Sequence, residues 1–225
     1  NIESEDSVNA ILRLRGLDDE NFVNSHYVVF ATKNGTVKKT SLEAYSRPRT
    51  KGVIAINVAN GDEVVDVRLT NGHNELIMAN RNGRAVRFDE KTIRTMGRTA
   101  TGVRGIRLDK GDDQVVGMIV VNNSVQETVM VVSENGYGKR SEVENYRKTN
   151  RGGKGVKTMN ITDKTGRLVA IKNVTDDNDL MIINKSGITI RLAVSDCRVM
   201  GRATQGVRLI NLSKKNDVIA SVCKT

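Results

Sequence analysis

The basic residues of this sequence recur at fixed distances from two series of glycines, which makes them the first candidates for chemistry. The first series is Gly35, Gly83, Gly136 and Gly187, and a basic residue stands four positions after each: Lys39, Arg87, Arg140 and Arg191. The second series is Gly52, Gly102, Gly155 and Gly206. In its last three members an arginine stands four positions earlier (Arg98, Arg151, Arg202), and a basic residue stands two positions later (Arg104, Lys157, Arg208). The first repeat has Ile54 at the later position and offers Arg47, Arg49 and Lys51 instead.

These side chains are suited to binding phosphate. A guanidinium donates two parallel hydrogen bonds to phosphate oxygens, and a glycine-rich backbone can bring its N–H groups to the same atoms. Because equivalent positions of a radial repeat fall on one rim, the pattern predicts a basic belt. For any single lysine, the alternative is an ordinary solvated charge. A curved row of phosphate contacts would bind and bend a duplex without reading its bases, and no recognition helix is apparent.

The composition favours an anionic partner. The chain has 225 residues with 36 Lys and Arg against 26 Asp and Glu, giving a net charge of +10. Nucleic acid is the first interpretation of that balance and an acidic membrane surface the second. Aromatic residues make up only 3% and Trp is absent, which weakens any function based on stacking single-stranded bases.

Catalytic and metal chemistry have little material here. Two cysteines and two histidines are too few for a disulfide framework, a zinc site or a histidine-based catalytic dyad. The glycine-rich run 151–155 lacks the spacing of an ATP-binding loop, and no Gly-x-Ser-x-Gly motif is present. The acidic pairs Asp112–Asp113 and Asp176–Asp177 fit solvated turns. We therefore expect no cofactor, no metal and no catalysis in this chain.

The elements that position the basic residues are predicted to be strands of an all-β array. Three of the first glycines follow Asn, and Asn-Gly is typical of a tight hairpin turn. The spacings are 48, 53 and 51 residues in the first series and 50, 53 and 51 in the second. In each repeat we expect an apolar strand before the turn, a more polar strand after it, a loop, a Gly-Val strand and a last apolar strand. Four short strands in about 50 residues indicate a propeller-like disc of blades.

We expect one domain over residues 1–225, with repeats at about 27–70, 75–121, 128–174 and 179–225. Residues 1–14 resemble the last strand of a preceding repeat, and we expect an orphan strand there. The absence of an initiator Met indicates a piece of a longer chain. No apolar run approaches the roughly 20 residues of a membrane span, and no secretory signal is visible. A reducing cytoplasm is the expected setting, with no membrane partner.

Long strings of this sequence resemble the C-terminal domain family of DNA gyrase A. They are Asn34–Thr40, Met96–Leu108, Asn135–Arg140 and Gly201–Val207. The resemblance implies a β-pinwheel, a propeller-like disc whose blades exchange strands, and it implies that duplex DNA wraps around a basic outer edge. It adds Lys38, Lys139 and Lys154 to the candidate DNA contacts. The run Thr149–Gly155 is similar to the Gln-Arg-Arg-Gly-Gly-Lys-Gly box of the family but differs at its first two positions and lies in the third repeat.

By that resemblance, the partners are double-stranded DNA, the remainder of gyrase A, and gyrase B. ATP, Mg²⁺ and the cleavage tyrosine would belong to other parts of the enzyme, a bacterial type II topoisomerase acting on the nucleoid. Two other functions stay open. One is the C-terminal domain of the corresponding DNA-cleaving protein of topoisomerase IV, which is similar in fold. The other is a protein-interaction propeller, whose binding would not depend on Arg98, Arg151 and Arg202. An enzyme built on a propeller is the least favoured.

Overall fold

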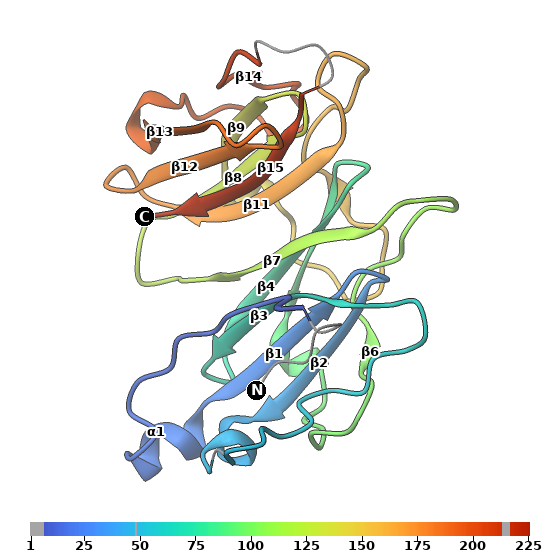
Figure 1. The fold of residues 1–225 in the computed structure, drawn as a ribbon, viewed down its shortest axis with the longest axis vertical. Coiled ribbons are helices and arrows are strands. Elements are labelled where there is room, and N and C mark those ends of the chain that lie inside the picture. The colour runs from blue at the N-terminus through green and yellow to red at the C-terminus, as the bar shows by residue number, and fades with distance from the viewer. Residues whose placement is uncertain (1–6, 48, 213–216) are drawn as a thin grey trace.

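The computed structural model describes residues 7–47, 49–212 and 217–225, and it is built almost entirely of β-strands. Three sheets of four strands and one of three follow one another along the chain. The first sheet lies at one end of the molecule and the last sheet at the other (Figure 1). The predicted all-β, propeller-like fold class is confirmed.

Each repeat begins with an antiparallel hairpin. The strands before the turns have the bounds that the sequence predicts: β1 (Tyr27–Thr32), β4 (Glu75–Asn80), β8 (Thr128–Ser133) and β12 (Asp179–Asn184). The strands after the turns are β2 (Thr36–Ser41), β5 (Arg84–Asp89), β9 (Tyr137–Glu142) and β13 (Thr189–Ala193). The turn glycines have φ between 77° and 91°, a left-handed conformation that side chains with a Cβ disfavour.

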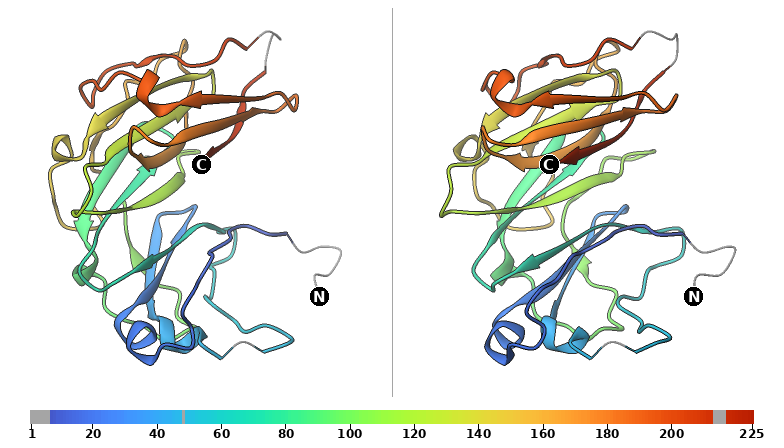
Figure 2. Two further views of the ribbon diagram at one scale, coloured as in Figure 1. Left: turned by 90° about the vertical axis from the view of Figure 1, so that its left-hand side faces the viewer. Right: turned by 60° about the vertical axis from the view of Figure 1, so that its left-hand side comes forward.

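The last strand of each repeat pairs with the other side of the first strand. These inner strands are β3 (Val64–Thr70), β7 (Val115–Val121), β11 (Leu168–Val174) and β15 (Ile219–Lys224). Consecutive inner strands contact one another from β3 through β15. Apolar side chains of neighbouring sheets form shared cores, such as the cluster that joins Ile77 and Ile119 of the second sheet to Val131 and Ile171 of the third. The sheets therefore stack in sequence along an arc (Figure 2).

The Gly-Val strand of each repeat pairs with the sheet before it. These two-residue outer strands are β6 (Val103–Arg104) on β2, β10 (Val156–Lys157) on β5 and β14 (Val207–Arg208) on β9. A blade is therefore not one contiguous repeat, and the exchange of strands implied by the family resemblance is what the structure has. The equivalent segment 52–56 of the first repeat forms no strand, since no sheet precedes it in this sequence.

The expected orphan strand at residues 1–14 is not formed in its described part. Residues 7–16 have no strand, although Leu12 and Leu14 pack on the first core. Each inner strand needs the first strand of its own repeat as a partner, and no such strand stands between this segment and β1. Residues 1–6 lie outside the described residues. The chain instead enters β1 through a short helix that the sequence analysis missed, α1 (Glu20–Ser25), where the Asp19 carboxylate accepts from the N–H groups of Asn21 and Phe22.

The loops after the second strands each begin with a single 3-10 turn. These turns are η1 (Leu42–Tyr45), η2 (Glu90–Thr92), η3 (Val143–Asn145) and η4 (Val194–Asp196). Leu42, Val143 and Val194 are buried at the first position of their turns. These turns fix the start of the loop that runs to the next outer strand.

Gly155 lets the third repeat reach the second sheet. A Cβ at this position would lie 2.1 Å from the carbonyl oxygen of Ala85 on β5, and its φ is 71°. At Gly153, two residues earlier, the nearest atom would be 3.9 Å away. We expect Gly155→Ala to lower the free energy of unfolding by about 3 kcal/mol, through backbone strain and the displacement of β10. Urea titration of both variants measures this, and equal stabilities of Gly155→Ala and Gly153→Ala would contradict it.

Candidate nucleic-acid interface

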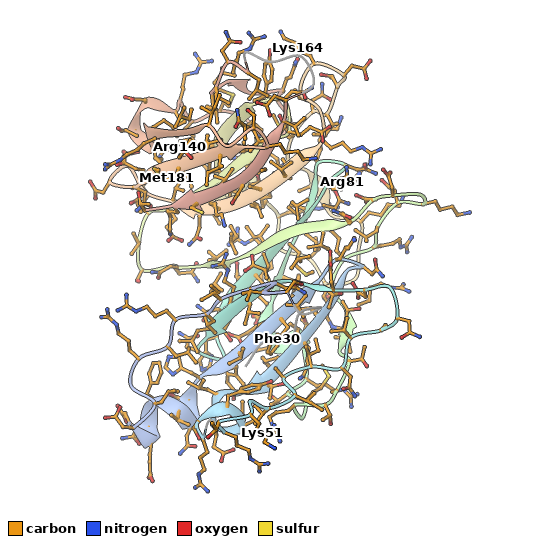
Figure 3. All side chains as sticks on the ribbon, viewed as in Figure 1. Phe30, Lys51, Arg81, Arg140, Lys164 and Met181 are labelled. Carbon is orange, nitrogen blue, oxygen red and sulfur yellow. The ribbon has the colours of Figure 1, made fainter. Side chains whose placement is uncertain are left out.

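The structure separates the sixteen candidate residues by burial. Four are buried: Lys38, Lys39, Lys139 and Arg140. Four are half-buried: Arg87, Arg98, Arg151 and Arg202. Eight are exposed: Arg47, Arg49, Lys51, Arg104, Lys154, Lys157, Arg191 and Arg208. Figure 3 shows this contrast for two of them, with Lys51 at the margin of the first sheet and Arg140 within the ribbons of the upper part.

The residues four positions after the turn glycines connect consecutive repeats. Arg140 donates to the carbonyl of Val194 in η4 at 3.0 Å and to the hydroxyl of Thr128, and it pairs with Asp176. Arg87 donates in the same way to the carbonyls of Val143 and Tyr146 around η3. These side chains are spent on the next repeat's turn. The prediction that they contact DNA is corrected for this reason.

Lys39 makes the same connection by a different chemistry. Its ammonium donates to the backbone carbonyl of Glu90 at 2.9 Å and lies 3.7 Å from a carboxylate oxygen of that residue. Glu90 is fully buried, and it also accepts from the Thr70 hydroxyl and the Asn74 amide. Lys39 is therefore part of a buried ion pair, which removes it from the interface. Lys38 and Lys139 are buried as well, and their contacts lie beneath the loops that lead to the outer strands.

The last of this series, Arg191, is exposed. Its guanidinium pairs with Asp179 across the β12–β13 hairpin, with Nε donating at 2.6 Å. The structure gives it no 3-10 turn of a following repeat among the described residues. Its charge is balanced by that carboxylate, so it contributes less to an anion site than an unpaired arginine would.

The arginines four positions before the second glycines each reach back to the previous repeat's Gly-Val segment. We call Arg98, Arg151 and Arg202 the bridging arginines. Arg151 donates to the carbonyl of Arg104 at 3.0 Å, Arg202 to that of Lys157 at 2.5 Å, and Arg98 to that of Ile54 at 3.5 Å. Two of them also bind a turn carbonyl, Thr92 for Arg151 and Asn145 for Arg202.

This geometry brings two cations together at each blade boundary. The exposed side chains of Arg104, Lys157 and Arg208, which we call the outer-strand cations, lie on β6, β10 and β14. The bridging contacts place Arg151 beside Arg104, and Arg202 beside Lys157. No carboxylate within the described residues forms an ion pair with any member of these two groups. Paired cations without a counter-ion, on the outermost strands, are a site for anions.

The segment Thr149–Gly155 forms a shallow hollow of about 270 Å³ against β5 and β10. Arg147 and Lys154 line it together with backbone of the glycines. Lys154 lies 3.1 Å from Asp109, which neutralises part of its charge. The hollow therefore contributes N–H groups and Arg147 more than it contributes Lys154.

Sequence analysis missed one series of basic residues. Arg94, Arg147 and Arg198 each stand eight positions before a second glycine, and all three are exposed. The same repeat alignment that found the bridging arginines contains this signal. They lie in the loops between the 3-10 turns and the outer strands, so they extend the cationic surface.

Lys148, next to Arg147, differs from it in being paired. Its ammonium lies 3.0 Å from Glu75 and 3.2 Å from Asp89, and these hydrogen bonds raise the pKa of Lys148. Burial raises the pKa of Glu75, but the hydrogen bonds from Lys148 and Arg87 outweigh it and the pKa lies below its ordinary value. This cluster connects the second and third repeats and offers little free charge.

Arg47, Arg49 and Lys51 of the first repeat are exposed, as the belt requires. Arg47 lies beside acidic residues, since it lines a hollow together with Asp18, Glu20 and Glu43. The equivalent of the outer-strand cations in this repeat is Ile54, which is 61% exposed. The cationic surface is therefore densest over the second to fourth repeats.

Other kinds of site find no support in the described part of the chain. It contains no group of three or more His, Cys, Asp or Glu residues placed to bind a metal ion. Cys197 is buried, Cys223 is exposed, and neither is in a disulfide. Among the residues described, no helix has the length and apolar character that crossing a membrane would need.

A family model described as "DNA gyrase C-terminal domain, beta-propeller" matches residues 26–71, 74–122, 127–175 and 178–222. This chain belongs to that family. It is 44% identical over 223 residues to the DNA gyrase A protein of Staphylococcus epidermidis and 43% identical to that of Staphylococcus aureus. Each of these alignments covers 99% of this chain and 24% of the relative, so the chain spans about a quarter of the length of the curated relatives it matches.

Two solved structures show the same fold. A DNA gyrase A C-terminal domain has a TM-score of 0.86, with 24% identity over 100% of this chain and 72% of the other. The C-terminal domain of DNA topoisomerase IV has a TM-score of 0.83, with 30% identity over 91% of this chain and 63% of the other. The first likeness concerns the fold alone. The higher identity to gyrase A proteins, 44%, agrees with the gyrase family over the topoisomerase IV alternative.

Proposed function

We propose that this domain binds duplex DNA through the phosphates and wraps it along the outer strands of the sheets. The observation that carries the proposal is the pairing of outer-strand cations with bridging arginines at successive blade boundaries. Each pair offers two positive groups beside outer-strand backbone, which suits one phosphate group. Because the pairs repeat from sheet to sheet along an arc, they favour a curved path for the duplex (Figure 2).

Recognition of this kind does not depend on base sequence. Contacts to phosphates supply affinity that falls with salt, and the cost of bending a duplex is of the order of 1–6 kcal/mol for a site of 20–30 base pairs. Several phosphate contacts offset that cost. The only α-helix in the described residues has six residues, too short to read a major groove.

Within a gyrase, we propose that this domain directs the DNA segment that the rest of the enzyme passes through a break. The partners are then the remainder of gyrase A together with gyrase B, which carry the cleavage and ATP-hydrolysis steps with Mg²⁺. The domain itself contributes binding and the path of the DNA, and needs no cofactor for either. Its place is the bacterial cytoplasm, on the chromosome.

Ligation of a nicked plasmid in the presence of the domain tests this function. Protein is removed after ligation, and the linking number is read on a gel beside a salt-dependent binding assay. We expect a shift of one consistent sign together with binding that weakens steeply with salt. Salt-sensitive binding without a shift would limit the function to binding. No binding at low salt would favour the protein-interaction propeller.

A further inference from the structure

Two buried lysines occupy equivalent places in the first and third sheets. Lys38 and Lys139 stand three positions after their turn glycines and are 0% and 1% exposed. The same position holds Val86 in the second sheet and Ile190 in the fourth. Burying an ammonium costs free energy unless polar partners are supplied, so its presence in alternate sheets calls for partners that the other two sheets lack.

The partners are backbone carbonyls of the loops that carry bridging arginines. Lys38 donates to the carbonyl of Arg98 itself, and to that of Ala55 at 2.5 Å. Lys139 donates to the carbonyl of Gly201, next to Arg202, at 3.2 Å. In both sheets, therefore, a buried ammonium attaches the loop from which a bridging arginine extends.

Each ammonium faces an aromatic residue and an arginine, without a carboxylate in ion-pair contact among the described residues. At Lys38 these are Arg98 on the loop, Tyr45 of η1, whose hydroxyl donates to the same Ala55 carbonyl, and the ring of Phe30 at 5.3 Å. At Lys139 they are Arg202 and Tyr146, together with the Ser141 hydroxyl, which accepts from the ammonium at 2.9 Å.

We propose that Lys38 and Lys139 are positioning residues for the DNA-binding surface, and that their charge keeps the Arg98 and Arg202 loops in the conformation that presents these arginines to phosphate. The inference rests on the proposed function and adds its regulation by pH. When the ammonium loses its proton, the charge-assisted bonds to the loop carbonyls weaken. The loop that carries Arg151 has Val86 beneath it and does not respond in this way.

The pH range follows from the environment of the two groups. Burial, and next the neighbouring arginine, lower the pKa of Lys38 and of Lys139 from 10.5 to about 8. Burial raises the pKa of Tyr45, and it raises that of Tyr146 to about 12, so neither tyrosine ionises near pH 8. The lysines are therefore the groups beneath these loops that change charge just above neutral pH.

Stability and DNA affinity should change in different directions over this range. Since the folded pKa of each lysine lies below the unfolded one, the unfolded state binds more protons between about pH 8 and pH 10.5, and the fold gains stability as pH rises. The loop contacts, in contrast, lose their charge-assisted bonds. A loss of DNA binding without a loss of stability is a result that a merely structural role does not produce.

The experiment measures the affinity of the intact chain for a fluorescent duplex from about pH 7 to about pH 9. The wild type is expected to bind five- to tenfold more weakly at about pH 9 than at about pH 7. Lys38→Met with Lys139→Met is expected to have the weaker affinity at both ends and a flat profile. Ile190→Met is the matched control, because it places the same side chain at the equivalent position of a sheet without a lysine, and it should keep the wild-type profile.

A flat profile for the wild type, or an unchanged profile in the double methionine variant, would overturn the proposal. A second pair, Arg98→Gln with Arg202→Gln, keeps both lysines and serves if the methionine variant does not fold. Its binding should be weaker but independent of pH, and a persisting pH dependence would also overturn it. Failure of the proposed function is recognised separately, as an absence of salt-sensitive duplex binding in the wild type at about pH 7.

Discussion

Replacing Arg104, Lys157 and Arg208 together by glutamine is expected to lower the affinity for duplex DNA about a hundredfold or more at roughly 0.1 M salt. These three side chains are exposed on consecutive outer strands and form no ion pair with a described carboxylate. Each lost phosphate contact reduces the slope of log K against log salt by about 0.9, so the triple variant should lose up to about 2.7 of that slope.

The matched control removes the same amount of charge elsewhere. Arg13, Arg15 and Lys224 are exposed but lie in the N-terminal segment and at the end of the inner strand β15. Their replacement by glutamine should change the affinity much less and leave the slope nearly intact. The loss should also be similar for duplexes of unrelated sequence, because phosphates are the same in all of them. Equal losses in the two triple variants would show that net charge, rather than the outer strands, determines binding.

Lys39→Met is expected to cost about 3–5 kcal/mol of folding free energy, the largest stability effect of a single substitution that we foresee. The substitution leaves the carboxylate of Glu90 without its ammonium partner, while that carboxylate remains fully buried. It also removes the hydrogen bond that connects β2 to the backbone of η2 in the next repeat.

Denaturant titrations of a double-mutant cycle measure this effect. Glu90→Gln alone keeps a polar group for Thr70 and Asn74, which both hydrogen-bond to the carboxylate. Combined with Lys39→Met, it should recover a large part of the lost stability, since no buried charge is then left unpaired. DNA affinity of the folded fraction should stay near that of the wild type. A variant that keeps full stability but loses DNA affinity would return Lys39 to the interface.

The comparison of Lys39 with Arg104 shows what a repeat alignment can and cannot separate. Both are basic, both recur at a fixed distance from a repeated glycine, and both series follow the same period. One lies in a buried ion pair and the other on the surface. A period places equivalent residues in equivalent surroundings, but it does not say whether those surroundings are solvent or the next repeat.

The pattern at Lys38 contained a hint of its burial. The position three after the turn glycine is Lys, Val, Lys and Ile in successive repeats, and the apolar members indicate an inward direction. The position two after the second glycine is Ile, Arg, Lys and Arg, with the apolar residue as the exception. Weighing the uncharged members of each series would have assigned both positions correctly.

The sequence alone determined the all-β class, the period of the repeats, the hairpin turns and the bounds of the first strand in each repeat. These depend on local properties, namely the conformational freedom of glycine at the turns and runs of apolar residues. Only the tertiary structure decided that the Gly-Val strand completes the preceding sheet, that residues 7–16 form no strand, and which cations remain in solvent. The physical reason is that these outcomes depend on contacts between residues about 50 positions apart, such as Arg151 with Arg104, and on which edges of each sheet are already occupied.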